Sequence, residues 1–139
     1  MKTSINMNWK GEMAFETELN GHKITVDAAP EVGGHDLGPR PKGLMMVALA
    51  GCTGMDVVSI LKKMHVEVAA FNVRIEGNLT EEHPKHFQDM KIIYEFAGAD
   101  LVEEKLRKAI DLSMEKYCGV SAVYKKAMNL SYDIEIKEQ

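Results

Sequence analysis

The chain has 139 residues and a mass of 15.5 kDa, which fits one domain with a single core, since domains usually contain roughly 100–150 residues. Hydrophobic residues make up 45% and charged residues 27% of the chain, which excludes intrinsically disordered, collagen-like and coiled-coil classes. The net charge of −4 leaves no basic surplus, so we expect neither nucleic acid nor anionic lipid as a partner.

No membrane or secretion signal is expected either. The longest apolar run near the chain centre, Leu44 to Ala50, has seven residues, against the roughly 20 of a membrane span. The first nine residues carry Lys2 but lack the apolar core and the cleavage site of a secretory signal. We therefore expect a cytoplasmic protein that makes no membrane contact.

The N-terminal residues have the pattern of a β-hairpin. Apolar side chains alternate with polar ones through residues 5–19 and again at Ile24 and Val26. Between them, Asn20-Gly21 tolerates the positive φ angles of a type I′ turn. Residues 30–41, rich in glycine and proline, predict a loop that leads to a helix.

Residues 42–64 predict a helix that is buried on all sides, because apolar side chains surround it. Two glycines, Gly51 and Gly54, flank Cys52 in this helix. Each costs about 1 kcal/mol relative to alanine inside a helix. The pair therefore indicates either tight helix–helix packing or the close approach of another backbone or a ligand.

The rest of the chain predicts strands and a second long helix. A capping box at Asp100 and Glu103 indicates the start of that helix, and Ser121 is expected to cap a short helical turn after it. The alternating segments that predict strands are 71–75, 90–96 and 130–136. This order predicts one α+β domain over residues 1–139, with sheets packed on two central helices.

The only two cysteines, Cys52 and Cys118, lie 66 positions apart. In a reducing cytosol such thiols are redox-active, metal-binding or merely buried. The histidines show no metal-ligand spacing, so no metal is expected. Buried free cysteine is usually inert, and for Cys52 we weigh inert packing and function equally. Cys118 precedes Gly119, where a thiol has room to move and to close a disulfide on an oxidised partner.

Several motifs together resemble the OsmC/Ohr family, the osmotically inducible and organic hydroperoxide resistance proteins, and within it the YhfA-like branch. The motifs that carry the resemblance are Pro41-Lys42-Gly43-Leu44-Met45, the segment from Ala50 to Leu61 around Cys52, His83-Pro84 with Phe87, Ala109-Ile110-Asp111-Leu112-Ser113, and Glu115-Lys116-Tyr117-Cys118-Gly119-Val120. The resemblance implies an intertwined homodimer with antiparallel sheets around two long central helices and an active site at the subunit interface.

The same resemblance implies a thiol peroxidase without a cofactor. Cys52 matches the peroxidatic position and Cys118 the resolving position, in an enzyme that turns organic hydroperoxides into alcohols and is re-reduced by a dithiol or a small protein reductant. The alternative is a dimeric small-ligand-binding protein of the same fold with weak or no peroxidase activity.

One departure from the family pattern favours that alternative. Family members carry a glutamate near the start of the first helix, which orients an arginine toward the reactive thiolate, whereas this chain has Lys42 and Gly43 there. A free thiol has a pKa near 8.5, so a cation must promote its ionisation. Arg40 and Lys42 are the nearest candidates, although either one alone is more simply a solvated charge. Asp56 would oppose ionisation, and we expect it to pair elsewhere.

Overall fold

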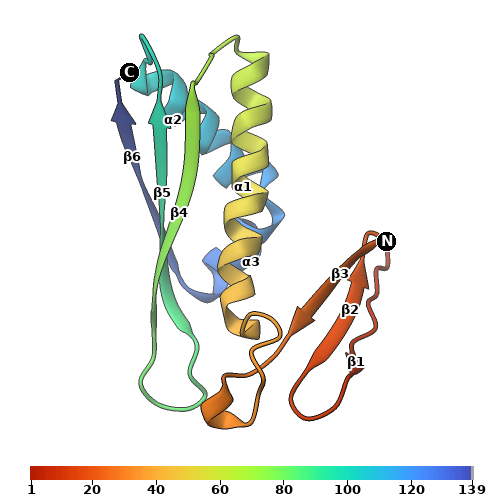
Figure 1. Cartoon of the computed structure of the whole chain (residues 1–139). Coiled ribbons are helices and arrows are strands. Elements are labelled where there is room, and N and C mark those ends of the chain that lie inside the picture. The colour runs from red at the N-terminus through yellow and green to blue at the C-terminus, as the bar shows by residue number, and fades with distance from the viewer. Residues whose placement is uncertain (139) are drawn as a thin grey trace. The chain divides into compact units, whose positions relative to one another are not determined.

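The computed structural model describes residues 1–138, which form two compact units divided after Val47 (Figure 1). The N-terminal unit contains an antiparallel sheet of β1 (Asn8–Trp9), β2 (Phe15–Leu19) and β3 (His22–Val26). The predicted hairpin is confirmed, because Asn20 and Gly21 join β2 to β3 with φ angles of 52° and 80°. The prediction of one domain over residues 1–139 stays a prediction.

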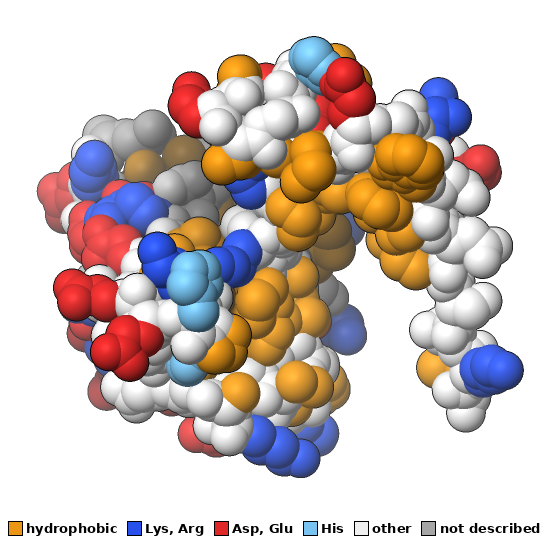
Figure 2. Space-filling model, turned by 90° about the horizontal axis from the view of Figure 1, so that it is seen from below, with side chains coloured by type: hydrophobic (Ala, Val, Ile, Leu, Met, Phe, Trp, Pro, Cys, Tyr) orange, Lys and Arg blue, Asp and Glu red, His pale blue; other side chains and the backbone are white. Residues whose placement is uncertain are grey.

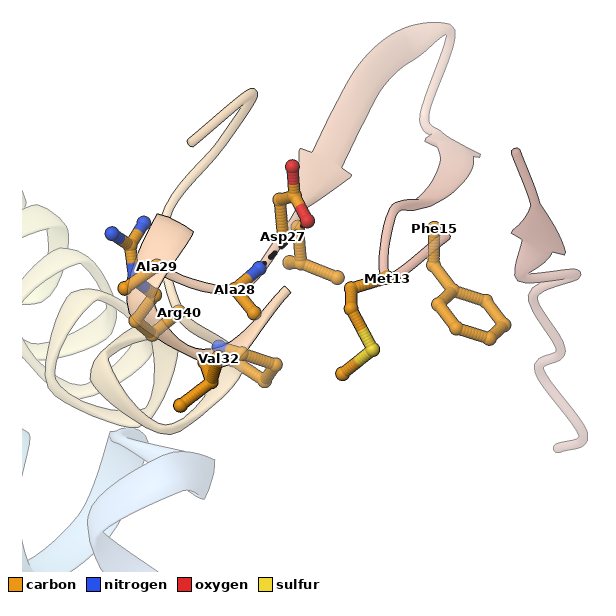
Figure 3. A pocket seen from close by; sticks show the side chains of 9 residues that line it. Met13, Phe15, Asp27, Ala28, Ala29, Val32 and Arg40 are labelled. Atoms are coloured by element: carbon orange, nitrogen blue, oxygen red, sulfur yellow. Dashed lines mark hydrogen bonds between the residues drawn. The ribbon is translucent and has the colours of Figure 1, made fainter. Parts of the chain in front are cut away.

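The loop after β3 is organised by Asp27, which is 3% exposed. Its carboxylate accepts hydrogen bonds from the backbone N–H groups of Ala28, His35 and Leu37, at 2.7, 3.1 and 3.2 Å (Figure 3 shows the first). Burial raises the pKa of Asp27, but these donors outweigh burial and hold the pKa below its ordinary value. A Cβ atom on Gly34 would lie 1.9 Å from a backbone oxygen, so the loop requires glycine there. Asp27 therefore fixes one loop conformation.

The second unit is a three-stranded sheet with helices. Its elements, with the helix that enters it, are α1 (Leu44–Lys63), β4 (Ala70–Leu79), β5 (Phe87–Ala97), α2 (Glu103–Leu112), a π-helical turn (Ser113–Tyr117), α3 (Gly119–Ala127) and β6 (Asn129–Lys137). The α+β class is confirmed. This sheet is mixed, however, since β5 pairs antiparallel with β4 and parallel with β6. The helical connection from β5 to β6 returns the chain in the same direction, as a parallel pair requires.

Helix α1 buries one stripe of side chains rather than its whole circumference. The stripe repeats every fourth residue, at Leu49, Thr53, Val57 and Leu61, which is the spacing of one helix face. Outside this stripe Met55 is 76% exposed and Val58 is 53% exposed. The prediction of a helix buried on all sides is therefore wrong for the single chain, and α1 keeps an uncovered apolar face.

By length and composition alone, residues 41–63 would also pass as a membrane-spanning helix. That is weak evidence for a membrane span, because the core helix of a soluble protein and a signal sequence pass the same test. The N-terminal sheet exposes apolar side chains as well, among them Trp9, Phe15 and Leu19, and Figure 2 shows hydrophobic patches on this sheet, at the right of the view.

The second helical region consists of α2, the π-helical turn and α3, and its N-caps differ from the predicted ones. Helix α2 begins at Glu103 after Val102, which makes no side-chain cap, so the predicted capping box at Asp100 is wrong. Asp100 itself has a positive φ of 56°. The predicted cap at Ser121 is also wrong, because Cys118 caps α3. The observed N-caps, Val102 and Cys118, lie two residues after and three residues before the predicted ones.

Candidate functional site: two thiols and a carboxylate

The fold brings Cys52 and Cys118 together. Their sulfur atoms and a carboxylate oxygen of Asp56 all lie within 4.8 Å of one another, and both cysteines are free thiols. Cys52 lies in the middle of α1 and is partly exposed, whereas Cys118 is 3% exposed. The structure thus pairs a thiol that solvent can reach with one that solvent cannot.

The π-helical turn sets the position of Cys118. The N–H of Cys118 donates to the carbonyl oxygen of Ser113 at 2.7 Å, a bond five residues long that widens the helix by one residue. The chain then leaves the helical conformation at Cys118, with φ −77° and ψ 102°, and restarts as α3. The Sγ of Cys118 accepts a hydrogen bond from the N–H of Ser121 at 3.3 Å. This turn and cap hold the buried thiol against α1.

Asp56 lies in the site, contrary to the expectation that it pairs elsewhere. Its Oδ2 accepts a hydrogen bond from the Ser113 hydroxyl at 3.0 Å, while the carboxylate stays within 4.8 Å of both sulfurs. The spacing of four residues from Cys52 places the two side chains on one face of α1. That spacing is the signal by which sequence reasoning could have placed Asp56 here.

Behind the carboxylate lies a buried chain of hydroxyl groups that sequence reasoning missed. Thr53 Oγ1 lies 2.7 Å from the Tyr94 hydroxyl and 2.8 Å from Ser113 Oγ, and all three residues are fully buried. Burial raises the pKa of Tyr94 well above its usual range, so its hydroxyl is neutral. These three hydroxyl groups link β5, α1 and the π-helical turn, and they fix the Ser113 hydroxyl that donates to Asp56.

The surroundings of Cys118 disfavour its thiolate. Burial is the largest cause that raises the pKa of Cys118, and the hydrogen bond with Cys52 raises it further. The backbone N–H and the side chain of Ser121 act in the opposite direction but do not compensate. Asp56 adds a negative charge nearby. The Cys118 thiol is therefore protonated at neutral pH in the single chain.

Within residues 48–138, no cationic side chain forms an ion pair with the Asp56 carboxylate. The ion pairs formed there involve other acids, such as Asp133 with Lys91 and Glu103 with Arg107. Arg40 donates instead to Asp36 at 2.6 Å and to a backbone oxygen at 3.0 Å within the N-terminal unit.

Lys42 is exposed in the same unit. The roles of Arg40 and Lys42 in activating a thiolate stay predictions. The first turn of α1 contains no acidic residue, so the family's helix-start glutamate has no equivalent there.

The two glycines beside Cys52 have different surroundings. A Cβ atom on Gly54 would make an ordinary contact with Val73 at 3.5 Å, whereas a Cβ atom on Gly51 would meet nothing within 4 Å. Among residues 1–138, therefore, no side chain or backbone makes the predicted close approach to Gly51, while Gly54 packs at an ordinary distance.

A separate cavity lies within the N-terminal unit, with a volume of about 420 Å³. Figure 3 shows its lining, in which Met13 lies between Val32 and Phe15 and Arg40 lies at one side. It contains neither cysteine.

The fold and the site define a class: an α+β protein that holds a pair of thiols between a central helix and the start of a later one. A family model described as OsmC-like protein matches residues 33–133, and the chain belongs to this OsmC-like family. It is 32% identical over 131 residues to the protein YhfA of Escherichia coli K12, covering 94% of this chain and 95% of the relative. The resemblance inferred from the sequence is thereby confirmed.

Solved structures agree with this assignment. A hypothetical protein from Aquifex aeolicus VF5 is 31% identical and superposes with a TM-score of 0.86 over 100% of this chain and 99% of its own. An organic hydroperoxide resistance protein OsmC from Legionella pneumophila superposes with a TM-score of 0.71 over 97% of both chains. The identity in the second case is 13%, so that likeness concerns the fold alone.

Proposed function

We propose that this protein is a thiol peroxidase that reduces organic hydroperoxides, with Cys52 as the peroxidatic thiol and Cys118 as the resolving thiol. The observation that carries the proposal is the approach of the two sulfurs to within 4.8 Å of each other, although the residues lie 66 positions apart in the chain. The difference in exposure supports the order of the roles, since a peroxide must reach the first thiol.

The reaction begins when the Cys52 thiolate attacks the distal oxygen of the hydroperoxide. The O–O bond breaks, the sulfur is oxidised by two electrons to a sulfenic acid, and the remaining alkoxide takes a proton and leaves as the alcohol. The Cys118 thiol then attacks the Cys52 sulfur, which forms a disulfide and releases water. An external dithiol reduces the disulfide through a mixed disulfide and restores both thiols.

The test is peroxide consumption with cumene hydroperoxide as substrate and dithiothreitol as reductant. Cys52→Ser should abolish turnover. Cys118→Ser should still give one equivalent of alcohol and a trapped sulfenic acid on Cys52. Mass spectrometry of the wild type after one equivalent of peroxide should show a Cys52–Cys118 disulfide ahead of methionine oxidation. Turnover that survives Cys52→Ser would exclude this mechanism.

The proposal includes a homodimer. One side of α1 has an uncovered apolar surface, formed by the small residue Gly51 and the exposed side chains of Met55 and Val58. A second copy that covers this surface would also bring another chain close to Cys52, and a cation supplied there would favour its thiolate. Because the thiols must stay reduced between turnovers, we also propose a cytoplasmic location.

The second candidate function is a dimeric small-ligand-binding protein of the same fold. The observation that favours it is Asp56, whose negative charge beside both thiols opposes thiolate formation. In that case neither cysteine variant would change the slow background loss of peroxide. The protein would instead retain a small apolar ligand through purification, which native mass spectrometry would detect.

A further inference from the structure

The cluster of Cys52, Asp56 and Cys118 has the chemistry of a metal site. Each residue offers one ligand atom, two sulfurs and one carboxylate oxygen, and these atoms lie within 4.8 Å of one another. The three come from the middle of α1 and from the start of α3. The sequence shows no metal motif because the third ligand lies 62 positions after the second.

The separations suit a tetrahedral ion after a small closure. Zinc binds thiolate sulfur at about 2.3 Å and carboxylate oxygen at about 2.0–2.2 Å. With tetrahedral angles, these bonds place neighbouring ligand atoms roughly 3.5–3.8 Å apart. Side-chain rotation of the partly exposed Cys52 and Asp56 can supply the closure of about 1 Å while the backbone stays fixed. Three protein ligands leave a fourth position for water or another small ligand.

The groups around the cluster hold two of the three ligands in place. The Ser113 hydroxyl donates to Asp56 at 3.0 Å, and the Ser121 N–H donates to the Cys118 sulfur at 3.3 Å. Partners of this kind orient metal ligands and sustain metal affinity. The Ser113 hydroxyl is in turn fixed by Thr53 at 2.8 Å, so two elements of the core support the site.

The charge of the cluster also calls for a cation. As metal ligands, two thiolates and a carboxylate would carry three negative charges, and within residues 48–138 no lysine, arginine or histidine forms an ion pair with Asp56. A divalent ion neutralises most of this charge and replaces the two thiol protons, which leave as H⁺. The two sulfurs favour a thiophilic ion over magnesium or calcium.

We propose that the reduced protein binds one thiophilic divalent cation, for which Zn²⁺ is the probe, through Cys52, Asp56 and Cys118. Both sulfurs are consumed as ligands, so the bound metal and the disulfide exclude each other. Metal binding therefore silences the thiols, and oxidation to the disulfide expels the metal. The proposal rests on the cluster alone and does not require peroxidase activity.

The test is Zn²⁺ binding by the reduced, peroxide-free protein in competition with a chromophoric chelator. One Zn²⁺ per chain should bind with release of protons, and Cd²⁺ should give the ultraviolet charge-transfer band of thiolate ligation. Cys52→Ser and Cys118→Ser should each remove the band or halve it. Asp56→Asn should weaken Zn²⁺ binding by at least about 10-fold, because the loss of a direct ligand should cost no less than the loss of a group that only orients a ligand.

The matched control is Asp111→Asn. Asp111 is also a partly buried carboxylate with one hydroxyl donor, Tyr132 at 2.6 Å, but it lies outside the cluster, so its variant should bind Zn²⁺ like the wild type. Wild-type affinity in Asp56→Asn, or one ion shared by two chains, would overturn the proposed ligand set. Disulfide formation by metal-free protein is measured separately, so a failure of metal binding does not count against the peroxidase and the converse also holds.

Discussion

Replacement of Asp56 by asparagine tests the electrostatic description of the thiol site most directly. The substitution keeps the size of the side chain and an oxygen that can accept from Ser113, but it removes a negative charge that lies within 4.8 Å of both sulfurs. Because a nearby anion opposes ionisation of a thiol, the pKa of Cys118 should fall in this variant.

The separation sets the magnitude. At 4.8 Å, the largest separation that the cluster allows, two unit charges interact by about 0.9 kcal/mol with the dielectric constant of water and by about 3.5 kcal/mol with the effective value of 20 that suits partly buried sites. At 1.36 kcal/mol per pKa unit, these limits correspond to roughly 0.6 and 2.5 units. Cys118 is 3% exposed while Asp56 is only partly buried, so we expect a decrease of about one unit or more in its pKa.

The assay is a pH titration of the ultraviolet absorbance of the thiolate. Cys52→Ser isolates the Cys118 thiol, and the comparison is between this variant and the same variant carrying Asp56→Asn. Asp111→Asn in the same background serves as the control, since its carboxylate lies outside the cluster. A Cys118 titration midpoint that stays in place when Asp56 is neutralised would refute the reasoning, because the carboxylate would then be turned away from the sulfurs in solution.

Three further predictions concern the groups that shape the site and the N-terminal unit. The pKa of Asp27 is lowered in the folded state, so its carboxylate contributes stability that is present above the ordinary carboxyl pKa near 3.9 and is lost as pH falls below it. Asp27→Asn should remove this contribution. Thermal unfolding between acidic and neutral pH measures it, and an unchanged pH profile would contradict the prediction. Gly51→Ala adds a methyl group on an open helix face, which would stabilise an isolated helix by about 0.5–1 kcal/mol; our dimer proposal instead expects weaker dimerisation by sedimentation, and an unchanged dimer would count against α1 as the interface. Thr53→Val should lower the free energy of unfolding in urea by about 1–3 kcal/mol, because it leaves the buried Tyr94 hydroxyl without its partner. Tyr94→Phe should then lower the free energy of unfolding less in the Thr53→Val background than in the wild type. Additive losses would show that the two hydroxyls do not interact.

The sequence predicts the local elements well where a residue pattern and a local interaction agree. Asn20-Gly21 specifies the hairpin because both residues accept positive φ angles. The sheet strands follow from alternation, since Met90, Ile92, Tyr94 and Phe96 are all buried on β5. Family membership follows from the motifs around the two cysteines, and with it the fold class.

The site itself depends on features that no local pattern encodes. Cys118 reaches α1 because the helix widens at Ser113, and the five-residue hydrogen bond there is set by packing rather than by propensity. The parallel pairing of β6 depends on the path of the helices between β5 and β6. The misjudged burial of α1 has a different cause, because the apolar circumference of this helix reflects a surface that a single chain leaves uncovered.

The charge of the reduced site affects both the proposed peroxidase reaction and the proposed metal binding. With Asp56 beside the deeply buried Cys118 thiol, a positive charge from outside the cluster would favour ionisation of that thiol. A cationic side chain brought by a second copy leaves the sulfurs free to attack peroxide, whereas a divalent ion takes both sulfurs as ligands. The two sources therefore have opposite effects: peroxidase activity should rise with dimer formation and fall with added Zn²⁺. An activity that responds to neither would contradict the proposed control of thiol ionisation by an external positive charge.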